Sequence, residues 1–191
     1  MSTVLTSSQS SSKDYTPHPA GSFMAVCADV FTKEMPNKYK GQIDGRGKMD
    51  NRDTITKVCI AFLTDELMDI NGEMVPRYAS YWGTATLGTV DYPSNVRKFI
   101  KAWWPSLTDA KLETLDMDNF IGKGAYLTIT NSTDKTGKVW ANVIAAAQPP
   151  KGATVPLIPA EFVRHKDKDV QANGTQAAPV TKDEEDDGLP F

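Results

Sequence analysis

Ser22-Phe-Met-Ala-Val-Cys-Ala-Asp-Val-Phe31 is the stretch of sequence from which the kind of fold can be predicted. Its apolar residues recur at every second position, so that one face carries Met24, Val26, Ala28 and Val30. A period of two is that of a β-strand, in which successive side chains point to opposite faces. We therefore expect a strand here, with one face in a hydrophobic core.

The same alternation predicts two further strands downstream. One covers residues 54–63, with apolar side chains at Val58, Ile60 and Phe62. The next covers residues 77–86 after a turn around Asn71-Gly72, and its aromatic residues are Tyr78, Tyr81 and Trp82. Residues 32–53 are rich in Gly, Asp, Asn and Lys and cannot build a core, so we expect a long loop or a flexible hairpin there.

The spacing then changes to that of helices. After Pro93, apolar residues fall at i, i+3, i+4 and i+7, which predicts one helix face formed by Val96, Phe99, Ile100 and Trp103. Ser94 or Asn95 can cap this helix, and Pro105 ends it. A second short helix is expected to begin at Thr108 and to bury Leu112 and Leu115.

Two more strands are predicted at residues 125–130 and 139–145, joined by a turn over residues 131–137. Three strands, a helical insert and two strands are the order of the OB-fold, a five-stranded, partly open Greek-key barrel. Other small α+β sheets can share these elements. We expect a mainly β chain with a helical insert, folded as an OB-fold barrel over residues 20–163.

The charge of the chain is unevenly distributed. Its 191 residues contain 21 Lys+Arg and 24 Asp+Glu, a formal charge of −3, and five of the acids are consecutive at residues 183–187. Without these five, residues 1–182 carry 19 acids against 21 bases, a net charge of +2. A slightly cationic body favours binding to an anionic polymer through its phosphates.

Several classes of protein are excluded by the composition. No apolar run reaches the length of a membrane span and the N-terminus lacks a secretory signal, so we expect a cytoplasmic protein. The two cysteines, Cys27 and Cys59, lie in apolar stretches, as is typical of buried free thiols. With His18 and His165 as the only histidines, we expect no zinc cluster, no histidine-dependent nucleophile and no cofactor.

The two ends differ in composition from the middle of the chain. Residues 1–19 begin with a Ser- and Thr-rich stretch and are expected to be flexible, as is a polar linker over residues 164–182. Residues 183–191 read Asp-Glu-Glu-Asp-Asp-Gly-Leu-Pro-Phe. The adjacent carboxylates repel one another. The apolar end, Leu189-Pro190-Phe191, can dock with Phe191 in an apolar pocket and the C-terminal carboxylate on a basic rim. An acidic run alone is also typical of a solubilising tail.

This ending resembles the C-terminal tip of bacterial single-stranded DNA-binding proteins. The matching residues are Asp186, Asp187, Pro190 and Phe191, with Leu189 in the place of an Ile, and Gly188 departs from the pattern. In the body, Asn119-Phe-Ile-Gly-Lys-Gly-Ala-Tyr-Leu-Thr-Ile and Gly137-Lys-Val-Trp-Ala-Asn-Val are similar to segments of phage-encoded proteins of this class. The Ser-rich start and the long 32–53 segment also favour a phage relative.

The resemblance implies an OB-fold that coats single-stranded DNA during replication, recombination or repair without catalysing a reaction. It also implies that the acidic tip recruits replication, repair and recombination proteins, of the host or of the phage. For a phage-encoded protein, the compartment is the host cytoplasm.

Single-strand binding requires cations for the phosphates and aromatic faces for the bases. Residues 33–57 contain seven bases and four acids, a net +3 in the segment between the first two strands. The alternative is a solvated loop whose charge has no partner. The candidate DNA-binding residues of this segment are Lys33, Lys38, Tyr39, Lys40, Arg46, Lys48, Arg52 and Lys57.

The third strand and the last hairpin supply the remaining candidates. Period two places Arg77 with Tyr81 on one face and Tyr78 with Trp82 on the other. We expect Arg77 and Tyr81 to be exposed, with Trp82 as the stacking residue if the register differs by one. In the hairpin the candidates are Lys135, Lys138 and Trp140, although each aromatic could instead belong to the core.

Besides single-strand binding, two other classes of function remain open, a DNA-processing enzyme and a structural or interaction protein, whereas a phosphate-binding loop does not. Residues 41–49 resemble a phosphate-binding loop, but Met49 stands where a Mg²⁺-binding Ser or Thr is required, so this interpretation is rejected. Asp116 and Asp118 could hold a metal ion in a DNA-processing enzyme, yet a lone Asp-x-Asp is more typical of a helix cap or solvated turn. The other alternative is a structural or interaction protein whose acidic tail only keeps it soluble. For the favoured single-strand binder we expect no membrane contact, and the sequence leaves open whether it forms a homo-oligomer.

Overall fold

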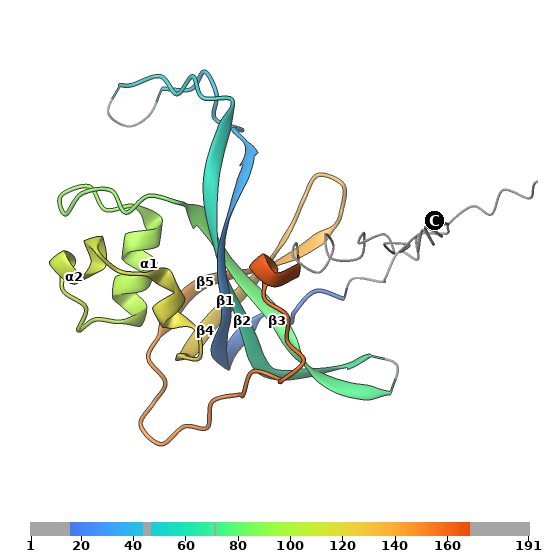
Figure 1. The fold of residues 1–191 in the computed structure, drawn as a ribbon. Helices are drawn as coiled ribbons and strands as arrows, with labels where there is room; N and C mark the ends of the chain where they lie inside the picture. The colour runs from blue at the N-terminus through green and yellow to red at the C-terminus, as the bar shows by residue number, and fades with distance from the viewer. Residues whose placement is uncertain (1–15, 44–46, 71, 169–191) are drawn as a thin grey trace, which may run out of the picture.

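The chain folds into five antiparallel β-strands and three short helices (Figure 1). The computed structural model describes residues 16–43, 47–70 and 72–168, and all statements below concern these residues. The strands are β1 (Gly21–Pro36), β2 (Thr54–Ile70), β3 (Glu73–Thr84), β4 (Gly124–Thr133) and β5 (Val139–Ala147). Between β3 and β4 lie α1 (Asn95–Trp103), α2 (Asp109–Glu113) and the 3₁₀-helix η1 (Met117–Phe120). The predicted order of strands and helices is confirmed.

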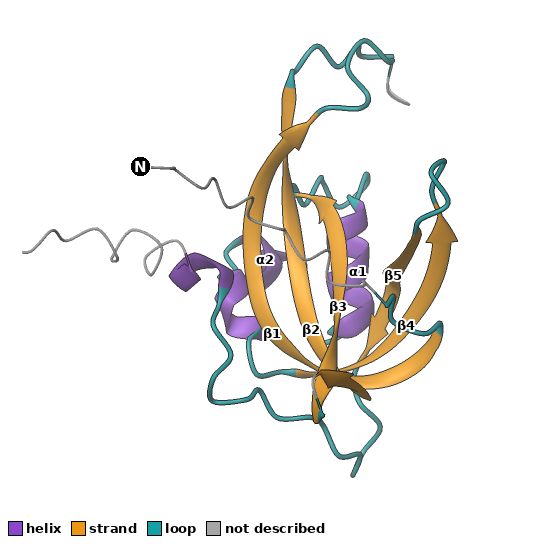
Figure 2. Cartoon of the chain, turned by 90° about the vertical axis from the view of Figure 1, so that its right-hand side faces the viewer, coloured by secondary structure: helices purple, strands orange, loops and turns teal. Residues whose placement is uncertain are grey.

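The strands form one sheet in the order β3-β2-β1-β4-β5. The sheet curls until its two edge strands, β3 and β5, approach each other (Figure 2). In the part of the chain that the structure describes, no hydrogen-bonded ladder joins these two edges. The sheet is therefore open between β3 and β5.

β1 and β2 extend much further than the sequence pattern predicts. Residues 32–36, expected to belong to a loop, continue β1 and pair with β2 up to Pro36 opposite Thr54. These residues are exposed on both faces, so their strand conformation comes from backbone pairing and leaves no apolar alternation to detect. Beyond them, the side chain of the buried Asn37 closes the loop, donating to the carbonyl of Arg52 at 3.0 Å.

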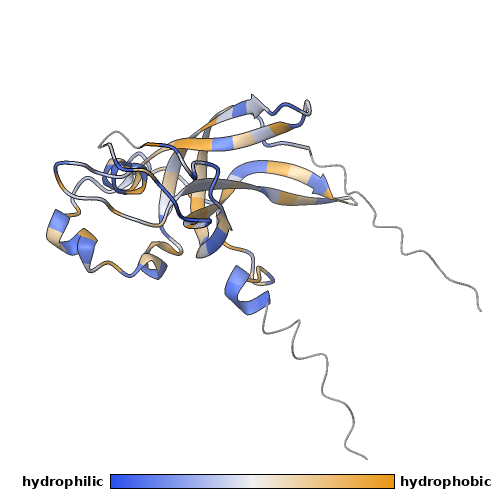
Figure 3. Cartoon of the chain, turned by 90° about the horizontal axis from the view of Figure 1, so that it is seen from above, coloured by the Kyte–Doolittle hydropathy of each residue, from blue (hydrophilic) through white to orange (hydrophobic). Residues whose placement is uncertain are grey.

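A β-bulge in β1 divides its apolar residues between two clusters. Cys27 pairs with Phe62 but Asp29 pairs with Ala61, so Ala28 is an extra residue in the strand. As a result Val30 packs in the main core, whereas Val26 and Ala28 point to the other face and pack with Leu63. The prediction that Met24, Val26, Ala28 and Val30 share one face is therefore wrong. Along the other strands, alternating hydrophobic and hydrophilic residues are visible in Figure 3.

The helices cover the inner face of the sheet. Ser94 caps α1 by accepting a hydrogen bond from the Arg97 backbone N–H, and Thr108 caps α2 in the same way from Lys111, as predicted. Arg97 is buried and joins the helices through Asp109 at 2.7 Å and Glu113 at 3.1 Å. No helix of the described residues is long and apolar enough to cross a membrane.

The main core lies between these helices and the inner face of the sheet. Trp103 is fully buried, as predicted, and its indole N–H donates to the carbonyl of Gly124 at 2.9 Å. Around it pack Phe62, Phe99, Ile100, Phe120 and Leu127. Cys27 and Cys59 are buried free thiols, also as predicted, and burial raises the pKa of each to about 12.

The segments on either side of the sheet pack more closely than predicted. His18, in the segment expected to be flexible, is buried and its Nε2 lies 2.7 Å from the Thr64 hydroxyl. After β5 the chain crosses the outer face, where Val155, Ile158 and Phe162 cover the second cluster. Residues 164–168, expected to begin a linker, contain a helical turn at 165–168 and bind the sheet through Arg164. We call residues 155–168 the C-terminal arm.

Candidate nucleic-acid interface

The outer face of β1, β2 and β3 carries two adjacent rows of side chains beyond the bulge. Strand pairing aligns Phe31 with Cys59 and Cys59 with Trp82, which makes the first row. Two residues further along β1, Lys33 pairs with Lys57, which makes the second row together with Thr84 of β3. Because side chains two residues apart in a strand point to the same face, an aromatic row lies beside a basic row.

The basic row is a pair of like charges. Lys33 is exposed, and the half-buried Lys57 donates from Nζ to the Thr84 hydroxyl at 3.5 Å. Like charges directly opposite each other on neighbouring strands repel. Such a pair gains most from an anion between the two ammonium groups, and a phosphate has the required charge.

The aromatic row presents Trp82 to solvent. Its ring meets Phe31 edge-to-face at 5.7 Å between centroids, and 44% of the residue remains exposed. The indole N–H donates to the Ser80 hydroxyl at 3.1 Å, which fixes the orientation of the ring. A large aromatic side chain held in place and left open on one side can stack on a base.

The expectation that Arg77 and Tyr81 are the exposed residues of the third strand is wrong. Trp82 is exposed instead, as in the alternative with the register shifted by one residue. Tyr81 is buried and stacks on Phe99 of α1 at 3.9 Å, because its face of β3 packs against that helix. Burial raises the pKa of the Tyr81 hydroxyl. Arg77, also expected to be exposed, is half-buried and its Nη1 donates to the Pro17 carbonyl at 3.0 Å.

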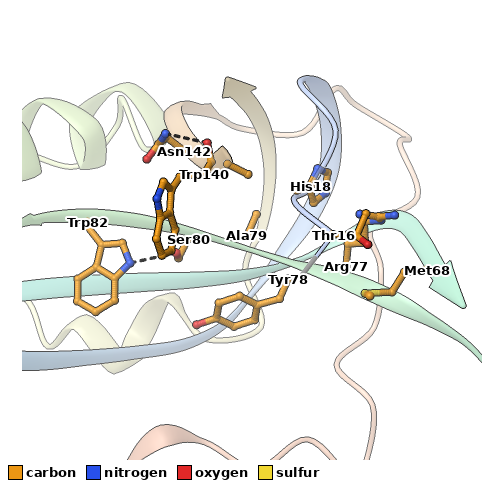
Figure 4. A pocket seen from close by; sticks show the side chains of 11 residues that line it. Thr16, His18, Met68, Arg77, Tyr78, Ala79, Ser80, Trp82, Trp140 and Asn142 are labelled. Carbon is orange, nitrogen blue, oxygen red and sulfur yellow. Dashed lines mark hydrogen bonds between the residues drawn. The ribbon is translucent and has the colours of Figure 1, made fainter. Parts of the chain in front are cut away.

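A cavity of about 480 Å³ lies in the gap between the sheet edges β3 and β5. Figure 4 shows its two ends, one lined by Trp82, Trp140 and Tyr78 and the other by His18, Thr16, Arg77 and Met68. Polar groups from both strands also line it: Ser80 accepts a hydrogen bond from Trp82, and Asn142 lies beside Trp140. The groove thus combines aromatic faces with hydrogen-bonding groups, as ligand sites commonly do.

Trp140 is held in this groove by the turn between β4 and β5. Its indole N–H donates to Asp134 Oδ2 at 2.9 Å, and Lys138 Nζ lies 4.2 Å from the centre of its ring. Asp134 also accepts hydrogen bonds from Thr136, and these donors hold the pKa of its carboxyl far below the usual range. Lys135 is exposed at the tip of the same turn.

The other predicted basic residues lie further out, beyond residue 36 at the end of the β1–β2 ribbon. There Lys40 forms an ion pair with Asp53, and Arg52 forms one with Asp50 at 2.8 Å, so both charges are compensated locally. Tyr39 is 59% exposed. Lys38 and Lys48 are exposed on the same loop. Arg46 lies outside the described residues.

The structure therefore brings together part of the predicted set. Lys33, Lys57 and Trp82 share one face. Trp140 lines the groove together with Trp82, and Lys138 lies over the Trp140 ring. Phe31 and Asn142 are not among the residues predicted from the sequence, which places Tyr78 on the face of Trp82 but not among the candidates. Phe31 could have been predicted to face outward, because it follows Val30 in the strand and period two places it on the other face. Its alignment with Trp82, however, depends on strand register.

The acidic residues named as possible metal ligands have other roles. Asp116 caps η1 by accepting from the Asp118 backbone N–H at 2.9 Å, which confirms the cap interpretation. Asp118 pairs with Arg164 at 2.8 Å and Lys166 at 3.1 Å, which lowers the pKa of its carboxyl. Across residues 16–43, 47–70 and 72–168, no cluster of His, Cys, Asp and Glu could hold a metal ion.

The predicted partner-binding tip, with Asp186, Asp187, Leu189, Pro190 and Phe191, lies outside the described residues. Within the described residues, the candidate interface consists of the outer face of β1–β3 and the groove between β3 and β5. A comparison of the sequence with models of known protein families finds no match, and a comparison with curated proteins finds none either.

Proposed function

We propose that the chain binds single-stranded DNA without sequence specificity and without catalysing a reaction. The observation that carries this proposal is the basic row of Lys33 and Lys57 directly beside the aromatic row of Phe31 and Trp82. Sequence-tolerant single-strand binding requires this combination, because phosphates attract cations and every base has a face that stacks. In a duplex the base faces are covered by neighbouring pairs, so exposed aromatic faces favour a single strand.

The strand order supports the proposal that the fold is an OB-fold barrel with an open seam. The order β3-β2-β1-β4-β5 places the helices between the third and fourth strands and leaves β3 facing β5. OB-folds bind oligonucleotides on the face of strands 2 and 3 and with the loops between strands 1–2 and 4–5. Trp82, the loop at residues 37–53 and the turn carrying Lys138 occupy these places.

The biological role follows from the resemblance of the C-terminal tip. We place the protein in phage DNA replication, recombination or repair in the cytoplasm of a bacterial host. The domain covers exposed single strands, and residues 183–191 recruit partner proteins through their acidic run and apolar end.

The test is titration of a labelled poly-dT oligonucleotide, with and without Mg²⁺. The wild-type chain should bind at about 20 mM salt and lose affinity steeply as salt increases. An absence of binding at low salt would favour an interaction protein with a solubilising tail. Degradation of the oligonucleotide in Mg²⁺ would favour a DNA-processing enzyme.

Variants locate the interface on this face. Trp82→Ala should weaken binding by about 5- to 150-fold, since stacking contributes about 1–3 kcal/mol per base. Replacing both Lys33 and Lys57 by Gln should reduce the slope of log K against log salt concentration by about 0.7, the value for the one phosphate that the two lysines share. Lys151→Gln, an exposed residue in the turn after β5, is the control. Equal binding by all variants would place the DNA elsewhere.

A further inference from the structure

The end of the C-terminal arm is anchored on the bulge of β1. Asp29 is buried, and its Oδ1 accepts hydrogen bonds from Arg164 Nε at 3.0 Å and from the Val30 backbone at 2.9 Å. Its Oδ2 accepts from the backbone N–H of His165 at 2.6 Å. Arg164 also reaches Asp118 at 2.8 Å. The backbone at residue 165 is thereby fixed beside the outer face of β1.

This anchoring places an aromatic heterocycle on the candidate interface. The imidazole of His165 stacks on Phe31, with 4.0 Å between ring centroids and 14° between ring planes. Phe31 lies in the aromatic row with Trp82 and two residues from Lys33, which begins the basic row. His165 therefore covers an aromatic face that is adjacent to paired cations.

The imidazole is held less firmly than the backbone that carries it. Within the described chain, the ring nitrogens of His165 have no hydrogen-bond partner, and the stack on Phe31 is the contact of its ring. The bonds to Asp29 come from the main chain of His165 and from Arg164. Rotation of the His165 side chain can thus uncover Phe31 while the arm stays in place.

We propose that the covered face of Phe31 is a nucleobase subsite and that His165 is its built-in occupant. A base entering the site displaces the imidazole and stacks on Phe31, and the phosphate beside it lies between Lys33 and Lys57. This inference rests on the proposed function, because it assigns a subsite for the same single-stranded DNA. It concerns the folded arm at residue 165 and does not involve the acidic tip.

One experiment follows the imidazole directly. The chain has only two histidines, so their ring-proton NMR signals can be assigned by comparison with a His165→Ala spectrum. Saturating the wild-type chain with a poly-dT oligonucleotide should move the His165 signals to the position of an unstacked histidine. DNA binding, measured by anisotropy, with His165 signals that keep their stacked position would overturn the proposal.

A second experiment measures the competition. His165→Ala removes the ring but keeps the backbone bond to Asp29, and it should bind poly-dT about 3- to 10-fold more tightly because the stack no longer competes. His165→Phe retains a ring on Phe31 and should bind no more tightly than wild type. Leu157→Ala, an exposed site on the same arm, is the control.

The two proposals fail in different ways. Equal or weaker binding by His165→Ala, in a wild-type background that binds DNA, would overturn the subsite and leave the proposed function standing. Tighter binding by both His165→Ala and His165→Phe would show that the charge or shape of histidine matters, and would also overturn it. An absence of binding by the wild-type chain would instead overturn the proposed function.

Discussion

Lys33 and Lys57 lie directly opposite each other on β1 and β2. This placement lowers the stability of the free protein but favours the binding of an anion. Their ammonium groups repel each other in the free protein, whereas in the complex with single-stranded DNA that we propose they attract the same phosphate. A surface selected for stability alone would pair one of them with an acid. Among single residues, this pair gives the strongest support for the anion binding that we propose for this face.

Lys33→Gln should consequently act in opposite directions on the two properties. We expect the free energy of unfolding to rise by a few tenths of a kcal/mol at low salt, while affinity for poly-dT falls. Urea unfolding and DNA titration on the same sample measure the two effects. Lys151→Gln should change neither, and a loss of both stability and affinity in Lys33→Gln would contradict this account.

His18 should make stability depend on pH. Its ring is buried between Phe23 and Thr64, and burial lowers its pKa below the ordinary value of 6.5. The unfolded chain then binds a proton more readily than the folded chain, so stability is full above pH 6.5 and falls as the pH decreases below it. The stability difference between wild type and His18→Gln should shrink from pH 7.5 to 5.5. A constant difference would show that His18 does not titrate with unfolding.

The helices were predictable because their signals are local. The cap at Thr108 and the apolar spacing around Phe99 lie within the elements that they define, so α1 and α2 were found almost to the residue. The outer face of β1–β3 was not predictable, because the side chains that it brings together depend on pairing between strands. The extra residue Ala28 and the outward orientation of Trp82 both depend on strand register, and the local pattern of a single sequence does not determine this register.

The contact between β3 and α1 depends on the small size of Gly83. A Cβ at this position would overlap with Val96 of α1 and approach the Tyr81 ring to 3.1 Å. Gly83→Ala should therefore destabilise the chain by about 1–3 kcal/mol through overpacking, measured by urea unfolding. Adding Val96→Ala should recover part of this loss in a double-mutant cycle, and purely additive effects would place the strain elsewhere.

The C-terminal arm joins the sheet to the helical segment between β3 and β4. Arg164 connects it to β1 through Asp29 and to η1 through Asp118. Arg164→Met should lower the free energy of unfolding by about 3 kcal/mol, because it leaves the buried carboxylate of Asp29 without its cation. Lys166→Met removes only an exposed ion pair to Asp118 and should cost less than about 1 kcal/mol. Thermal and urea unfolding of both variants test this, and equal losses would contradict it.

The open seam of the sheet also bears on how copies of the molecule behave together. A free edge strand offers unpaired N–H and C=O groups on which a strand from another chain can add, and this is a common route to aggregation. Here the two free edges, β3 and β5, face each other across a gap lined by Trp82 and Trp140. Each edge thus shields the other from strand addition, so copies of the chain can lie close together at high local concentration without joining their sheets.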